Sequence, residues 1–336
     1  MSSLFSAPTT ATLRRPGSVA FPRPLPREPL ASPTSPSTLD LSSEASPSVT
    51  PLPPAGDTAV LRPRWTLSDL VLSDSVRRQL ATLLSRIRNH DLIYHRWEMA
   101  HIDPIGSCRS INLYGPPGTG KSMTAEALAH ALNCPLLPVN YAELESKYVG
   151  ETPRNICHLF AAATRASAVL FFDEADALLS SRLTNISQAA DQAANLSRAV
   201  LLKQLDDFRG IVIFATNLAR NFDAAFVRRI LLHVELPLPD ESCRTRLWQT
   251  FLRPAVPGRE KIDWSKLAQL SAGLSGGDIK NALLLALADL AENFQDGDQL
   301  TTAHLTTAIS LVTRGKQDVG GEPTGLRATP THTAVC

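Results

Sequence analysis

The residues best suited to chemistry are the eight of Gly115-Pro116-Pro117-Gly118-Thr119-Gly120-Lys121-Ser122. Their spacing is that of a loop that binds the phosphates of a nucleotide. The three glycines let the backbone curl so that its N–H groups point at phosphate oxygens. Lys121 can then reach the β- and γ-phosphates, and the Ser122 hydroxyl can hold Mg²⁺. We therefore expect this loop, with Met123 directly after it, to bind ATP and Mg²⁺.

A second candidate site is the acidic pair Asp173-Glu174, which follows the apolar run Val169-Leu170-Phe171-Phe172. A buried strand would place Asp173 at its carboxyl end, where it can hold Mg²⁺ opposite Ser122. Glu174 would face the γ-phosphate, where a carboxylate can orient and polarise the attacking water. Such a pair by itself is equally typical of a strand end or a helix cap. Its place downstream of the phosphate loop makes the catalytic interpretation the stronger one.

Two asparagines end other apolar runs. Asn217 follows Phe214-Ala215-Thr216, and its amide can hydrogen-bond the attacking water or the γ-phosphate if the strand ends beside the first two motifs. Asn140 ends a run that begins at Leu136, and it could restrain Glu174 until substrate is engaged. Both roles depend on the neighbouring motifs, because an asparagine at a strand end is otherwise typical of a loop cap.

The elements that must position these residues alternate between strands and helices, which predicts an α/β fold with a five-stranded parallel sheet and right-handed crossovers. Ligands of such sheets collect at the carboxyl ends of the strands. The expected strands are Ile111–Tyr114, Leu136–Asn140, Ala168–Phe172, Ile211–Ala215 and His233–Leu236.

Helices are expected on both sides of this region. Before it, Ser73 or Asp74 can cap a helix with one apolar face, formed by Val76, Leu80, Leu83, Leu84 and Ile87. After Pro239 the strand signal ends, and a small all-α domain is expected. Its helices are predicted at Glu241–Leu252, Trp264–Leu270, Gly277–Asn293 and Thr301–Val312.

The expected domain organisation has four parts. Residues 1–62 form a disordered tail rich in proline, serine and threonine, since 12 of the 25 prolines lie in residues 1–60 and leave little apolar surface to bury. Residues 63–239 form the nucleotide-binding α/β domain, residues 240–314 the helical lid domain, and residues 315–336 a flexible C-terminal tail.

Composition excludes several classes of protein. The net charge is +1, so no global field favours nucleic acid or an anionic membrane, and no apolar run reaches the ~20 residues of a membrane span. The five cysteines lack metal-ligand spacing, which indicates a reducing compartment. We expect a cytoplasmic protein. Arginines without acids in the first 27 residues leave organelle targeting as an alternative.

With these residues assembled, the chain from about Trp65 to Thr313 resembles the AAA-type ATPases of the AAA+ superfamily. It is similar to the katanin–spastin group of the meiotic clade and to single-ring bacterial AAA ATPases such as those of contractile injection clusters. The stretches that carry the resemblance are Gly115–Ser122, Phe171–Asp176, Ala215–Asn217 and Phe222–Arg229.

The resemblance implies further roles. Arg228 occupies the place of an arginine finger, which reaches into the next subunit's site and neutralises charge on the γ-phosphoryl group. The family often has a second arginine three residues later, where this chain has Leu231; Arg229 could substitute. Gly277 occupies the sensor-2 position, and the absence of arginine there is usual in this clade.

The resemblance also suggests a polypeptide substrate. Lys147-Tyr148-Val149-Gly150-Glu151 is similar to the first pore loop, in which Tyr148 and Val149 would face a central channel and grip an extended chain. Without the family, Tyr148 would be an ordinary tyrosine near a glycine turn.

These features predict an ATP-hydrolysing motor that assembles with itself as a ring, a hexamer in the family, and threads protein substrates through its pore. One alternative is an ATP-dependent assembly switch or loader with little turnover, which the intact Glu174 disfavours and Leu231 keeps open. Another is a nucleic-acid-associated motor, which the near-neutral charge disfavours.

Overall fold

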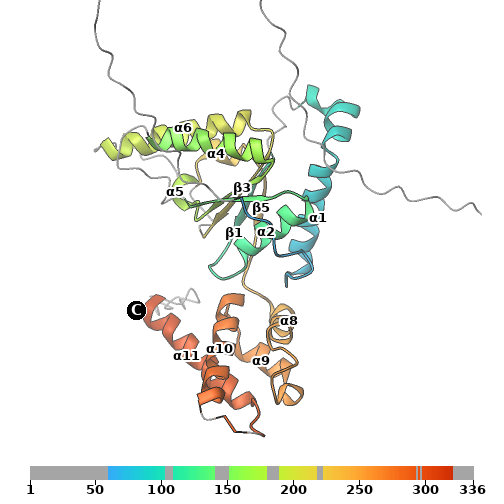
Figure 1. Ribbon diagram of the computed structural model, residues 1–336, viewed down its shortest axis with the longest axis vertical. Coiled ribbons are helices and arrows are strands. Elements are labelled where there is room, and N and C mark those ends of the chain that lie inside the picture. The colour runs from blue at the N-terminus through green and yellow to red at the C-terminus, as the bar shows by residue number, and fades with distance from the viewer. Residues whose placement is uncertain are drawn as a thin grey trace, which may run out of the picture. The chain divides into compact units, whose positions relative to one another are not determined.

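The computed structural model describes residues 60–102, 109–140, 151–179, 189–217, 222–292, 294–295 and 297–320. A sheet flanked by helices lies at the centre of this α/β part of the chain (Figure 1). It has five strands in the order β2-β3-β4-β1-β5, and every ladder between neighbouring strands is parallel. The predicted α/β fold class is therefore confirmed. The strands are β1 Arg109–Tyr114, β2 Leu136–Asn140, β3 Val169–Asp173, β4 Ile211–Thr216 and β5 Ile230–Glu235.

The fifth strand begins earlier than the sequence predicts. A strand over His233–Leu236 was expected from its apolar residues, but β5 already pairs with β1 at Ile230, opposite Ser110. The register between the two strands shifts after this pair, so Ile111 lies opposite Leu232. As a result Leu231 is a strand residue.

Helices cover both faces of the sheet, which explains why its strands are apolar without alternation. On one face α1 (Asp74–Arg88) and α2 (Lys121–Ala131) contribute to a core with alternate side chains of β1, β3 and β4. On the other face α4 (Glu151–Ala166) and α6 (Ala189–Asp207) lie side by side (Figure 1). There the rings of Phe172 and Phe214 stack with their centroids 5.3 Å apart.

Helix α1 forms as predicted. The Ser73 hydroxyl accepts a hydrogen bond from the Val76 N–H at 3.5 Å, which caps the helix, and the five predicted apolar residues are all buried. Beyond Asn89 the chain makes a π-helical turn η1 (Leu92–Arg96) and a short 3₁₀ turn η2 (Met99–His101), neither of which the sequence predicts.

Ordered structure also begins before Trp65. Leu61, which the predicted tail of residues 1–62 includes, exchanges two backbone hydrogen bonds with Leu136 of the edge strand β2, at 2.7 and 2.8 Å. The Arg64 N–H donates to a carboxylate oxygen of Glu126 at 3.1 Å. The hydrogen bonds with Leu136 satisfy part of the exposed edge of the sheet, and the contact with Glu126 ties the same segment to α2. The rest of the predicted tail, residues 1–59, lies outside the described residues.

Only helical elements follow Pro239 in the described part of the chain. They are α8 (Glu241–Phe251), the 3₁₀ turn η3 (Arg259–Lys261), α9 (Trp264–Leu270), α10 (Gly276–Glu292) and α11 (Thr302–Gly320). They bury a separate apolar core that includes Trp248. Helix α11 continues past the predicted end at Val312, so the first residues assigned to the C-terminal tail are helical here. In the ranges that the structure describes, no helix could span a membrane.

Candidate functional site

Three strands deliver the predicted site residues to one place. In the sheet order β3-β4-β1, the strand that ends at Thr216 lies between the strand that leads into the phosphate loop and the strand that ends at Asp173. Because parallel strands end at the same edge, Asp173, Asn217 and the loop at 115–122 become neighbours. Asn140 ends the next strand and lies opposite Asp173 in register.

The loop needs glycine at two of its positions. Gly115 has a φ of +145°, and a Cβ there would lie 2.2 Å from the carbonyl oxygen of Leu236. Gly118 has a φ of +76°, and a Cβ there would lie 2.4 Å from the Ser275 hydroxyl oxygen. Both positions combine left-handed backbone with close contacts that a side chain would disrupt. Gly120 then forms the N-cap of α2, whose N-terminus can attract an anion.

Lys121 is buried and points its ammonium group into the loop. Nζ donates to the carbonyl oxygens of Gly115 at 2.8 Å and Pro116 at 2.9 Å, and to Oδ1 of Asn217 at 2.8 Å. Burial lowers the pKa of Lys121, and the nearby Asp173 and Asp176 carboxylates oppose this shift. The Lys121 ammonium group is thus held where the oxygens of a bound phosphate could accept its hydrogen bonds in place of these carbonyl oxygens.

The Ser122 hydroxyl donates to Oδ2 of Asp173 at 2.8 Å. The other carboxylate oxygen, Oδ1, accepts the backbone N–H of Glu174 at 3.0 Å. A hydroxyl and a carboxylate are hard oxygen ligands, and Mg²⁺ is usually bound by one or two carboxylates together with phosphates and water. These two residues therefore fit the predicted magnesium site.

Glu174 has a strained backbone. Its φ is +51°, in the left-handed region that residues other than glycine rarely adopt, and such conformations concentrate at functional sites. Its side chain is exposed just beyond the carboxyl end of β3, which is the place predicted for the residue that polarises water.

Asp176 is a site residue that sequence reasoning missed. It begins the short helix α5 (Asp176–Leu179), and its Oδ1 accepts hydrogen bonds from the Thr216 hydroxyl and from the Asn217 N–H, the latter at 3.0 Å. It thus ties the acidic segment to the strand end that carries Asn217. A third acidic residue close behind the pair Asp173-Glu174 was visible in the sequence and could have pointed to Asp176. Its contacts with Thr216 and Asn217, however, follow only from the order of the strands in the sheet.

The two candidate finger arginines differ in their surroundings. The short helix α7 (Ala224–Val227) is capped by Asp223, and Arg228 follows it with an exposed side chain. Arg229 instead donates from Nε and Nη2 to the two carboxylate oxygens of Asp206 in α6, at 2.6 and 2.8 Å. Such a bidentate pair holds Arg229 within its own chain.

Gly277, at the predicted sensor-2 position, touches the phosphate loop with its backbone. Its N–H donates to the carbonyl oxygen of Gly118 at 3.0 Å, and a Cβ at Gly277 would lie 3.3 Å from the Gly118 Cα. The start of α10 is therefore in direct contact with the loop.

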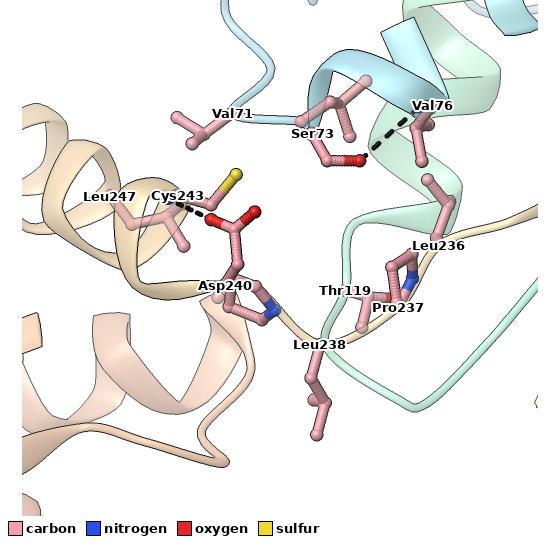
Figure 2. A pocket seen from close by; sticks show the side chains of 13 residues that line it. Val71, Ser73, Val76, Thr119, Leu236, Pro237, Leu238, Asp240, Cys243 and Leu247 are labelled. Atoms are coloured by element: carbon pink, nitrogen blue, oxygen red, sulfur yellow. Dashed lines mark hydrogen bonds between the residues drawn. The ribbon is translucent and has the colours of Figure 1, made fainter. Parts of the chain in front are cut away.

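A mostly apolar pocket opens beside this contact (Figure 2). It lies among the segment that enters α1, the loop at Thr119, the connection after β5 and the start of α8. Figure 2 shows Val71, Val76, Thr119, Leu236 and Leu247 on the walls of the pocket. At one side, Oδ1 of Asp240 accepts a hydrogen bond from the Cys243 N–H. An apolar cavity next to a phosphate-binding loop suits the base of a nucleotide.

Some predicted residues cannot be placed. Tyr148 and Val149, proposed as the pore loop, lie outside the described residues.

A phosphate-binding loop at the end of β1, with Asp173 on a strand beyond β4, defines a P-loop α/β domain. Residues 111–238 match the family described as "ATPase family associated with various cellular activities (AAA)", and this domain of the chain belongs to that family.

Individual proteins support the assignment. The chain is 35% identical over 212 residues to the proteasome-activating nucleotidase of Saccharolobus islandicus (strain Y.N.15.51). This alignment covers 61% of the chain and 53% of the nucleotidase. It is 33% identical over 271 residues to the ATP-dependent zinc metalloprotease FtsH 3 of Sphaerobacter thermophilus, covering 77% and 52% respectively. The chain thus spans about half the length of these relatives.

Among solved structures, the FIGL-1 AAA domain superposes with a TM-score of 0.59 at 23% identity, covering 75% of this chain and 85% of that one. This similarity establishes the fold.

Proposed function

We propose that the protein is an ATP-hydrolysing motor of the AAA+ class that assembles with itself as a ring and remodels polypeptide substrates. The observation that carries the proposal is the placement of four side chains at one end of the sheet. Lys121 donates a hydrogen bond to Asn217 and Ser122 donates one to Asp173, each at 2.8 Å. In the proposed complex Lys121 binds the β- and γ-phosphates, and Ser122 and Asp173 hold Mg²⁺. Glu174 polarises the attacking water and Asn217 orients it.

The base of ATP would occupy the apolar pocket next to Thr119. Its walls come from both the α/β region and α8, and Gly277 links α10 to the phosphate loop. Nucleotide binding can therefore bias the placement of the helical region, which is the kind of coupling that a motor requires.

The ATPase proposal is tested by measuring ATP turnover against protein concentration for the wild type and for Glu174→Gln, with the mass determined in ATP. We expect specific activity to rise steeply as a ring-sized species appears, because Arg228 would complete the site of a neighbouring copy. Removing the base should lower turnover by about 10²–10⁴-fold while ATP still binds. The exposed Glu260→Gln variant is the matched control. Unchanged turnover in Glu174→Gln would contradict the assigned role.

The polypeptide substrate is the finer part of the proposal. The matched relatives are named for proteasome activation and for proteolysis, and Tyr148-Val149 has the sequence of a loop that grips an extended chain. A tyrosine offers a broad contact surface that tolerates many sequences.

Tyr148→Ala is therefore expected to keep basal ATP hydrolysis nearly intact and to lose its stimulation by an unfolded polypeptide such as reduced, alkylated casein. The measurement is turnover with and without that polypeptide, and Tyr141→Ala serves as the control from the same segment. Equal stimulation of the wild type and Tyr148→Ala would remove the pore-loop role while leaving the ATPase assignment in place.

A second candidate function, an ATP-dependent assembly switch with little turnover, is favoured by one observation. Arg229 is bound to Asp206 and Leu231 is a strand residue, which leaves Arg228 as the candidate finger. Tight ATP binding and ring formation without turnover at any protein concentration would support this function instead.

A further inference from the structure

Between α1 and β1, outside the nucleotide site, three side chains with metal-ligand chemistry come together. They are His90, Asp91 and His95. Each offers one ligand atom, and these atoms lie within 4.8 Å of one another. Two imidazoles and a carboxylate form the kind of donor set that binds zinc and similar transition metals.

The imidazole of His90 is the unusual member of this cluster. Both of its ring nitrogens are inaccessible to water, and neither has a hydrogen-bond partner among the residues that the structure describes. Oδ1 of Asp91 lies 3.6 Å from Nδ1, which is too long for a hydrogen bond. Buried polar atoms are normally satisfied, so an unpaired imidazole beside two further ligands calls for an explanation.

The backbone explains how the ligands meet. The N–H of Trp97 donates to the carbonyl oxygen of Leu92 at 2.9 Å, five residues earlier, so the chain here winds as a π-helix. His90 and Asp91 directly precede this turn and His95 lies within it, and the ring centroids of His90 and His95 are 6.2 Å apart. Such π-turns are frequent at functional sites. The ring of His90 is held in place by stacking on Tyr94, with centroids 4.5 Å apart.

We propose that His90, Asp91 and His95 bind a divalent transition-metal ion of the zinc class. His90 supplies a fixed nitrogen, while Asp91 and His95 are exposed and can close onto the ion from the solvent side. Three protein ligands leave the remaining coordination positions to water. Mg²⁺ is not the expected ion, because it prefers oxygen ligands throughout.

The positive charge of a neighbouring residue, Arg109, opposes binding of the metal ion. Arg109, the first residue of β1, lies close enough to act electrostatically on both His90 and Asp91. Its guanidinium partly neutralises Asp91 and repels a bound cation. The site is therefore expected to bind more tightly when this charge is removed, which a purely structural role of the histidines does not predict.

A metal here would fix the turn that connects α1 to β1. Helix α1 begins at the wall of the nucleotide pocket, and β1 leads directly into the phosphate loop. The ion would thus brace the segment that joins two parts of the nucleotide site without touching the nucleotide.

The test is a titration of the nucleotide-free full chain with Co²⁺, followed by the visible absorption that imidazole-bound Co²⁺ gives. Relative to the wild type, His95→Ala and Asp91→Asn should each weaken Co²⁺ binding by about 10–100-fold or more. Removing a residue that only supports a metal ligand already lowers metal affinity by this factor, so removing a ligand should lower it at least as much. Arg109→Met should strengthen it. His158→Ala, an exposed histidine of α4, should change nothing, and Asp173→Asn reports any Co²⁺ at the predicted magnesium site.

His90→Ala should abolish the absorption, and if that variant does not fold, the exposed His95 variant decides. The proposal is overturned if the wild type shows no such absorption up to millimolar Co²⁺, or if His95→Ala binds as tightly as the wild type. It is also overturned if Asp173→Asn alone removes the signal.

Discussion

Replacing Arg228 by alanine is expected to lower ATP turnover by about 10³-fold or more, which is the usual effect of removing an arginine finger. Arg228 follows α7 with an exposed side chain, outside its own chain's cluster of Lys121, Ser122 and Asp173. A guanidinium in this position can complete a neighbouring copy's site, where it neutralises the charge that develops on the γ-phosphoryl group. ATP binding should persist, because the phosphate loop is unchanged.

Mixing variants tests whether the finger acts between chains. Arg228→Ala keeps an intact Glu174, and Glu174→Gln keeps an intact Arg228, so some interfaces of a mixed ring contain a complete site. Each variant alone should be inactive, and the mixture should recover part of the wild-type turnover. Mixed rings that form but remain inactive would contradict a finger acting in trans.

Arg229→Ala is the matched control for this experiment. Because Arg229 binds both carboxylate oxygens of Asp206, its removal should mainly loosen the contact between α6 and the segment after α7. We expect Arg229→Ala to retain more turnover than Arg228→Ala. A different result is a loss of turnover in Arg229→Ala as large as in Arg228→Ala, together with rescue by Glu174→Gln. In that case the ion pair between Arg229 and Asp206 must open in the ring, and Arg229 is a second finger.

Asp176→Ala is expected to lower turnover by about 10²-fold, the effect that a small misplacement near reacting groups can have. Asp176 accepts hydrogen bonds from the Thr216 hydroxyl and the Asn217 N–H, and Asn217 in turn contacts Lys121. Without Asp176, the amide of Asn217 should lose its fixed position. The affinity for ATP should change little, so the measurement is turnover and ATP binding on the same protein.

The Asp176→Asn variant separates the two possible contributions. It keeps an oxygen that can accept both hydrogen bonds but removes the negative charge near Lys121. Turnover close to the wild type in Asp176→Asn would assign the effect to the hydrogen bonds. Thr216→Val combined with Asp176→Ala should be non-additive, since both changes break the same contact. Wild-type turnover in Asp176→Ala would exclude the positioning role.

The local parts of this protein were predictable from its residues. The strand–loop–helix around 115–131, the buried strand before Asp173 and the capped helix α1 all appear as expected, because each depends on neighbours a few residues away. Predicted boundaries failed where a distant strand sets them. The start of β5 at Ile230 depends on pairing with Ser110, and Leu61 is ordered by Leu136.

By itself the sequence determined which residues could bind phosphate and Mg²⁺, through residue types at fixed spacing and strands apolar enough to be buried. Only the tertiary structure decided which of them meet. Placing β4 between β1 and β3 brings Asn217 to Lys121 and Asp176 to Thr216, and the fold brings Gly277 to Gly118 and Arg229 to Asp206. These contacts join residues far apart in the chain, so no local pattern encodes them; they follow from strand order and packing.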